Sequence, residues 1–166
     1  MASSSKPPGA ADERESVSLV QATENVIDEC RMVLPGIQAL FGFQLIVVFS
    51  DGFDSHVSDT GRVLHLAATG LVAIAVALIM TPAAFHRQTA TRHVSSGFLR
   101  LASRLLILSM LPLAIGISLD FYLVARVVVD FGVALGAAVV LFLIFMALWY
   151  GLPRLRRMRD LAGAKD

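Results

Sequence analysis

The sequence predicts an all-α fold: a four-transmembrane-helix bundle with an N-terminal amphipathic helix leading into the first span. Hydrophobic residues make up 56% of the 166 residues, whereas soluble domains contain about 45–50%. This surplus falls in four blocks, 32–49, 63–80, 105–119 and 131–150. A bilayer core about 30 Å thick requires roughly 20 residues of helix, and the shorter third block reaches that length through its apolar flanks.

The N-terminal segment differs from the rest in composition. Residues 1–16 are small, polar and proline-containing, which predicts a disordered cytoplasmic tail. A helix should begin near Ser18, because Ser18-x-x-Gln21 fits a capping box. The membrane domain then covers 17–160, with spans at about 32–50, 63–82, 99–124 and 129–151, and 161–166 form a C-terminal tail. No apolar signal-peptide core precedes the first span, so we expect that span to act as an uncleaved anchor.

Polar residues continue into the first span. Glu24, Asp28, Arg31 and Gln38 recur at helical spacing, which predicts one polar stripe running from the interface into the bilayer. Gln38 and Gln44 carry amides that are costly against lipid, so both should face the bundle interior. Interhelical hydrogen bonds are the favoured interpretation of these amides, and a permeation path is the alternative.

Small residues predict where the later spans pack. Gly70, Ala73 and Ala77 share one helix face in the second span, which suits close helix contact. The fourth span contains Gly132-x-x-x-Gly136. That motif favours packing within the bundle, with homodimerisation as the alternative.

Basic residues predict the orientation. Twelve of the fourteen Lys and Arg residues lie in the N-terminal segment, the joint after the second span or the C-terminal tail. The positive-inside rule then puts both termini in the cytoplasm, as in a multi-pass protein of the cell (cytoplasmic) membrane. The opposite joints are acidic and carry Asp51, Asp54, Asp59, Asp120 and Asp130.

A polar cluster is expected where the first span leaves the cytoplasm. Its structural interpretation is a set of ion pairs that fixes helix register. The alternative is an ion or proton relay through Glu29 and His86, because histidine titrates near neutral pH. The predicted members are Asp28, Glu29, Arg31, Gln38, His86, Arg87, Arg100 and Arg104.

Other polar groups predict weaker sites. His56 and His65 could hold a cation with the outer aspartates, but a solvated loop is the favoured interpretation of their spacing. Cys30 is the single cysteine, so no intrachain disulfide forms. No charged residue lies at the centre of a span, whereas cation-coupled transporters use a carboxylate there. The basic C-terminal tail is interpreted mainly as a topology determinant, and contact with anionic lipid head groups through Arg154, Arg156, Arg157 and Arg159 is the additional interpretation.

Three short motifs carry a resemblance. They are Glu29-x-Arg31, Leu34-Pro35-Gly36-x-Gln38 and Pro82-x-Ala84-x-His86-Arg87. In this order the chain resembles a domain-of-unknown-function family of small four-span bacterial membrane proteins, some members of which carry the label sodium:proton antiporter. The resemblance implies the four-span fold over most of the chain.

The preferred functional hypothesis is a non-catalytic structural or accessory membrane subunit. The alternative is a small cation- or proton-translocating, antiporter-like protein that acts as an oligomer, since four helices alone enclose little volume. We expect no enzyme activity, cofactor or bound metal, because no nucleophile–base or metal-ligand spacing occurs. The expected partners are the lipid bilayer and either further copies of the chain or another membrane subunit, but not nucleic acid.

Overall fold

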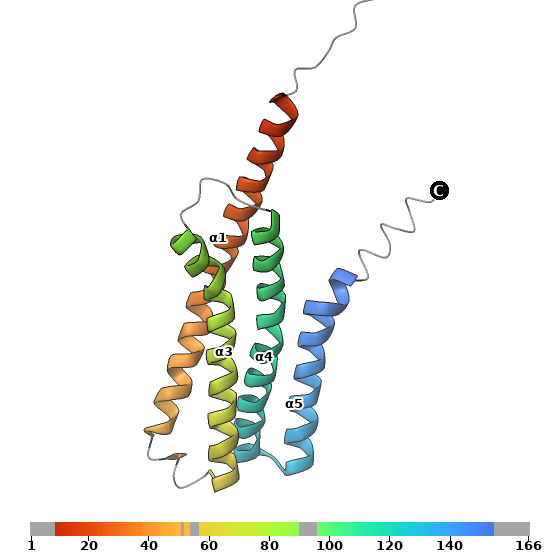
Figure 1. Ribbon diagram of the computed structural model, residues 1–166. Helices are drawn as coiled ribbons and strands as arrows, with labels where there is room; N and C mark the ends of the chain where they lie inside the picture. Colours follow the sequence, from red (N-terminus) through yellow and green to blue (C-terminus); the bar gives the residue numbers. More distant parts are fainter. Residues whose placement is uncertain (1–8, 51, 54–56, 90–95, 155–166) are drawn as a thin grey trace, which may run out of the picture.

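The computed structural model describes residues 9–50, 52–53, 57–89 and 96–154, and these form long helices without a strand. The helices are α1 (Gly9–Val48), α3 (Asp59–Thr89), α4 (Ser96–Val128) and α5 (Phe131–Met146), which continues as the π-helical turn η1 (Ala147–Gly151) (Figure 1). Four stretches are long and apolar enough to cross a membrane: Glu24–Val48, Asp59–Phe85, Gly97–Val128 and Phe131–Arg154. The prediction of an all-α protein with four potential spans is confirmed.

The helices extend beyond the apolar blocks of the sequence. α1 begins at Gly9, inside the segment expected to be a disordered tail and before the capping box at Ser18. α3 begins at Asp59 and α4 continues to Val128, each four residues beyond the predicted span. Asp120, expected beside a joint, therefore lies two turns inside α4.

The bundle has two ends. At the terminal end α1 begins and α5 stops; at the hairpin end α1 leads into α3 and α4 into α5 (Figure 1). α3 and α4 form the most extensive helix–helix contact. α1 packs on both of them, whereas α5 packs chiefly on α4. The molecule is thus a three-helix core with a fourth helix beside α4.

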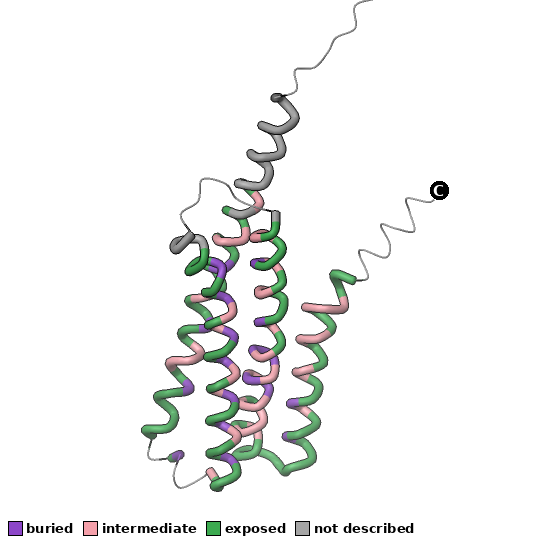
Figure 2. The backbone as a smooth tube through the Cα atoms, in the orientation of Figure 1, coloured by how far each residue is buried: buried purple, intermediate pink, exposed green. Residues whose placement is uncertain are grey.

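One face of α3 forms the centre of this core. Its buried residues alternate at steps of four and three, the spacing of a single helix face (Figure 2). The prediction from Gly70, Ala73 and Ala77 is wrong, because these three small residues are exposed. The buried face consists of Gly61, His65, Ala68, Val72, Ala75, Ile79 and Pro82.

Gly116 lets α4 lie directly against α3. A Cβ atom at this position would be 2.9 Å from Cγ2 of Val72 and 3.0 Å from the carbonyl oxygen of Ala68. Close backbone approach of this kind is how small residues favour helix association in membranes. The contact therefore fixes the separation of the two central helices.

The middle of the core is apolar. Val72, Ala75, Ile79 and Leu113 pack there with Ile37 of α1. Two serines of α4 are buried near these residues, but their hydroxyl groups bond within their own helix. Ser109 donates to the carbonyl of Leu106, and Ser118 donates to that of Ala114.

α5 contacts α4 through alanines. Ala134 and Ala138 are its buried residues. Gly132 and Gly136 are exposed, and a Cβ added at either would meet nothing within 4 Å. The expectation that this glycine pair packs within the bundle is therefore wrong.

Candidate functional site

The acidic and basic residues of α1 lie on its surface. Asp28, Glu29 and Arg31 are all exposed. Arg31 pairs with Asp28 one turn away at 3.6 Å, and the two side chains are 77% and 63% exposed. Exposed pairs of this kind contribute about 0–1 kcal/mol. The pair lies along one helix and does not join two.

The other predicted members whose side chains the structure describes are not joined to these residues. Arg100 and Arg104 are exposed on α4, and neither forms an ion pair with an acidic side chain among the residues that the structure describes. Gln38 is exposed, so its expected position inside the bundle is wrong. The side chains of His86 and Arg87 lie outside the described residues, and the relay through Glu29 and His86 stays a prediction.

Of the four tail arginines predicted to contact lipid, one lies in the described part of the chain. Arg154 is exposed at the end of the fourth span. Arg156, Arg157 and Arg159 lie outside the described residues, as do His56, Asp51 and Asp54.

A buried polar network joins three helices near the hairpin end. His65 of α3 lies 3.1 Å from Asp120 of α4, measured from Nδ1 to Oδ1. The second ring nitrogen, Nε2, lies 2.9 Å from the backbone carbonyl oxygen of Gln44 in α1. The side-chain amide of Gln44 donates to Oδ2 of Asp120. Each residue of the network therefore contacts both others.

The helices bring these groups together because each lies on a buried helix face. His65 continues the small-residue face of α3, and Asp120 lies four residues after Gly116, one turn along α4. His65 is 6% exposed and Gln44 is 4% exposed. The ring of Phe53 covers the imidazole edge-on, with 5.4 Å between ring centroids. Burial makes every unmade hydrogen bond in the network costly.

Hydrogen-bond accounting restricts the protons in this network. The carbonyl of Gln44 can only accept, so Nε2 of His65 must donate to it. Nδ1 faces a carboxylate oxygen of Asp120, and one proton must lie between the two atoms for a hydrogen bond to form. Either His65 is an imidazolium beside an ionised Asp120, or a protonated Asp120 donates to neutral His65. Both arrangements hold one proton more than a neutral histidine beside a carboxylate.

A cavity of about 450 Å³ adjoins the network. Its polar side chains are those of Gln44, Ser50, His65 and Asp120, and its apolar walls include Leu40 and Val127. Oε1 of Gln44 is buried and has no hydrogen-bond partner among the described residues. The site can hold a proton between His65 and Asp120. No cluster of three or more His, Cys, Asp or Glu suited to a metal occurs in the described segments.

Sequence reasoning identified one member of this network and missed two. Gln44 faces the interior as predicted. The expectation that His65 lies in a solvated loop is wrong, because α3 begins six residues earlier and buries the ring. Two signals were present: His65 lies three residues before Ala68 and seven before Val72, and Asp120 is a single carboxylate within an apolar run. An ionisable residue in such a run by itself indicates a functional site.

Comparisons with known proteins give a family. No curated protein and no solved structure matches the chain. The model of one family, described as a family of unknown function, matches residues 12–153. That match covers α1 from its fourth residue, all of α3, α4 and α5, and the whole polar network, in agreement with the resemblance found in the motifs. The chain therefore belongs to the family of unknown function DUF6328.

Proposed function

We propose that this protein is a non-catalytic accessory membrane subunit. In this proposal, the packing of its helices responds to protonation of the His65–Asp120 pair. The observation that carries the proposal is that both ring nitrogens of His65 face acceptors, one on α1 and one on α4. A single proton thereby decides whether one residue can join three helices. Histidine exchanges protons in the physiological pH range, which suits such a role.

The proposed response follows from losing that proton. If Nδ1 keeps its hydrogen, Nε2 presents a lone pair to the carbonyl of Gln44; if Nε2 keeps it, Nδ1 presents a lone pair to Asp120. Either way one contact becomes repulsive. Of the described side chains in contact with the ring, Asp120 is the one with an ionisable group, since Gln44 and Phe53 are neutral. α1 packs less extensively than α3 and α4 pack on each other, so α1 should move.

The apolar middle of the core supports a proton-holding role over a conducting one. Toward the terminal end the network is followed by Val72, Ala75 and Leu113, which are buried against one another. The buried hydroxyls of Ser109 and Ser118 donate within their own helix, so neither offers a hydrogen for a relay. A proton held at His65 therefore has no polar chain to follow through the described core.

A spin-label distance measurement tests the proposal. Labels on cysteines introduced at Val48 and Val128, in a Cys30→Ala background, report the separation of α1 and α4 at the hairpin end. Both positions are exposed and lie outside the lining of the cavity. We expect the separation to increase as pH rises and to stop depending on pH in His65→Gln and Asp120→Asn.

Asp28→Asn is the matched control, because it removes an exposed carboxylate from α1 far from the network. It should keep the full pH response. A separation that does not change with pH in the unaltered chain, or an unchanged response in both network variants, would contradict the proposal.

Cation or proton translocation by an oligomer is the second candidate. Asp120 favours it, because a carboxylate inside α4 beside a cavity is the kind of group that exchanges protons in transporters. Reconstituted vesicles with a pH dye and a sodium gradient test this directly. Sodium-dependent proton flux that is lost in Asp120→Asn but kept in Glu29→Gln would support translocation. Flux equal to that of empty vesicles would exclude it and leave the proton-responsive subunit.

A further inference from the structure

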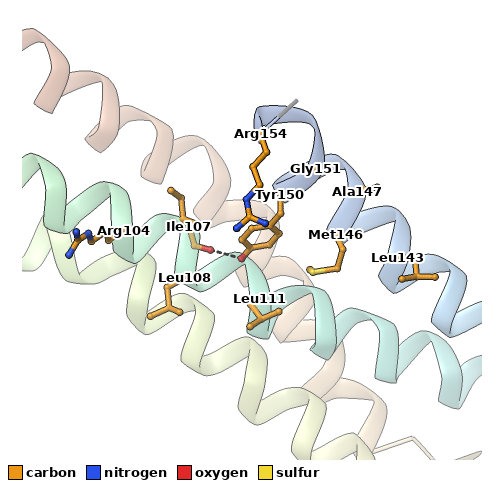
Figure 3. A pocket seen from close by; sticks show the side chains of 10 residues that line it. All are labelled: Arg104, Ile107, Leu108, Leu111, Leu143, Met146, Ala147, Tyr150, Gly151 and Arg154. Carbon is orange, nitrogen blue, oxygen red and sulfur yellow. Dashed lines mark hydrogen bonds between the residues drawn. The ribbon is translucent and has the colours of Figure 1, made fainter. Parts of the chain in front are cut away.

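A second cavity lies between α4 and α5 toward the terminal end. Its volume is about 890 Å³, and each of the two helices contributes an arginine to its lining (Figure 3). Arg104 comes from α4 and Arg154 from the end of the fourth span. Most of the remaining lining is aliphatic or sulfur-containing, including Leu111 and Met146. We call this cavity the α4–α5 groove.

The groove exists because α5 leaves part of α4 uncovered. The buried contacts of α5, Ala134 and Ala138, lie in its first half. Farther along, Leu108 of α4 and Leu143 of α5 are each more than half exposed, so they do not cover one another. The two helices are bridged there by Tyr150, whose hydroxyl donates to the carbonyl of Ile107 at 2.7 Å (Figure 3).

The two arginines of the groove have no acidic partner in the described part of the chain. The ion pairs there involve Arg31, Arg62 and His65, and the latter two lie toward the hairpin end. A guanidinium group near the membrane boundary is stabilised by an anion, and phosphate matches its fork of N–H donors. The groove thus has apolar walls and two guanidinium groups that are available to bind an anion.

We propose that the α4–α5 groove binds one anionic phospholipid, with the phosphate held by Arg104 and Arg154 and an acyl chain lying against Leu111, Leu143 and Met146. The volume is within the range of about 300–1,000 Å³ that ligand sites occupy. Trp149 and Tyr150 directly precede the end of the span, and such aromatic residues mark the level of lipid head groups. Arg104 lies about 12 Å along α4 from its start at the same end, which leaves the deeper part of the groove for the chain.

Lipid competition on the purified full-length protein tests this inference. The protein in neutral detergent is titrated with phosphatidylglycerol or phosphatidylcholine, and bound lipid is counted by native mass spectrometry. Each arginine near the head group should contribute about fivefold in affinity, so phosphatidylglycerol should be preferred by about 25-fold. In the double variant Arg104→Gln/Arg154→Gln the preference should fall to about one.

Arg62→Gln is the matched control, because Arg62 is a basic residue of the hairpin end that pairs with Asp59. It should keep the full preference. The variant Leu143→Trp keeps both arginines and fills the groove, so it should release the lipid while leaving the charge unchanged. Circular dichroism melting of each variant shows whether it is folded before its lipid binding is compared.

Three results would overturn the inference. The first is equal binding of the two lipids by the unaltered protein, which means non-specific annular lipid. The second is an unchanged preference in the double arginine variant. The third is full competition by soluble glycerol phosphate, because then the apolar walls contribute nothing and the site takes a free phosphate. None of these results bears on protonation at His65, so this inference stands or fails independently of the proposed function.

Discussion

The two ends of the bundle treat their polar residues in opposite ways. At the hairpin end, His65 and Gln44 are buried, Asp120 is partly buried, and the three are bonded across three helices. Toward the terminal end, Asp28 and Arg31 are exposed and pair along one helix, while Arg104 and Arg154 face a groove. Among the described residues, ionisable His and Asp side chains therefore join helices where the small-residue face of α3 packs against α4. The exposed charged side chains of the terminal end can instead interact with solvent or lipid.

Removing Asp120 should give the largest effect on this contrast. Asp120→Ala leaves Nδ1 of His65 and the amide of Gln44 without an acceptor. Loss of one partner of a buried pair costs about 3–5 kcal/mol of unfolding free energy. The measurement is equilibrium unfolding in mixed detergent and SDS, with both variants and the unaltered chain at the same pH.

The matched substitution at the terminal end is Asp28→Ala, which removes an exposed carboxylate from a surface pair. It should change the unfolding free energy by at most about 1 kcal/mol. Equal losses in the two variants would remove the distinction between the two ends.

Filling the contact at Gly116 should have the next largest effect. Gly116→Val places methyl groups against Val72 and the backbone of Ala68, and overpacking of this kind costs about 1–3 kcal/mol. Because α3 and α4 both run from one end of the bundle to the other, spin labels should report displacement of these helices at the hairpin end and at the terminal end alike. Gly136→Val, which meets nothing within 4 Å, serves as the control and should leave stability and label distances unchanged.

The two glutamines of α1 provide a sharper comparison within one helix. Gln44→Leu removes the hydrogen bond to Asp120 and should cost about 1 kcal/mol, the usual scale for such bonds in membranes. Gln38→Leu changes an exposed residue and should stay within about 0.5 kcal/mol of the unaltered chain. Unfolding of both variants under one detergent condition is the measurement. A larger loss of unfolding free energy in Gln38→Leu than in Gln44→Leu would mean that Gln38, and not Gln44, lies on the face of α1 that packs against α3 and α4.

The smallest predicted effect is at Tyr150. Tyr150→Phe removes the hydroxyl that bridges α5 to the carbonyl of Ile107 and should cost about 0.6 kcal/mol. Protection of α5 from hydrogen exchange should fall while that of α3 is unchanged. Loss of protection throughout α3 would show that the bridge supports the core and not α5 alone.

The overall fold could be predicted because it depends on the apolar runs of the sequence, and each run is local. The ends of the helices could not, since α3 and α4 continue through polar residues that usually mark a joint. This error placed His65 in a loop and Asp120 beside one. The two residues are 55 positions apart in the chain, and a single sequence contains no periodicity that relates residues so distant.

The faces of the helices were harder to predict than their existence. In α3, Gly70, Ala73 and Ala77 are as small as the residues that are buried, so size alone does not select the inner face. In α1, Gln38 and Gln44 are six positions apart in the sequence, which places them on different sides of the helix. The lipid-facing surface is as apolar as the core, and hydrophobicity therefore carries little information about direction in a membrane helix.

The order of the helices in the chain has a consequence for biogenesis. Every residue of the polar network and of the close α3–α4 contact precedes Phe131. The extensive helix–helix contact of α5 is with α4. Since chains are synthesised from the N-terminus, the three-helix core can assemble before the last span leaves the ribosome. A nascent chain from which α4 has emerged while α5 is still inside the ribosome would thus already display the native arrangement around His65, and α5 would be added to a finished surface.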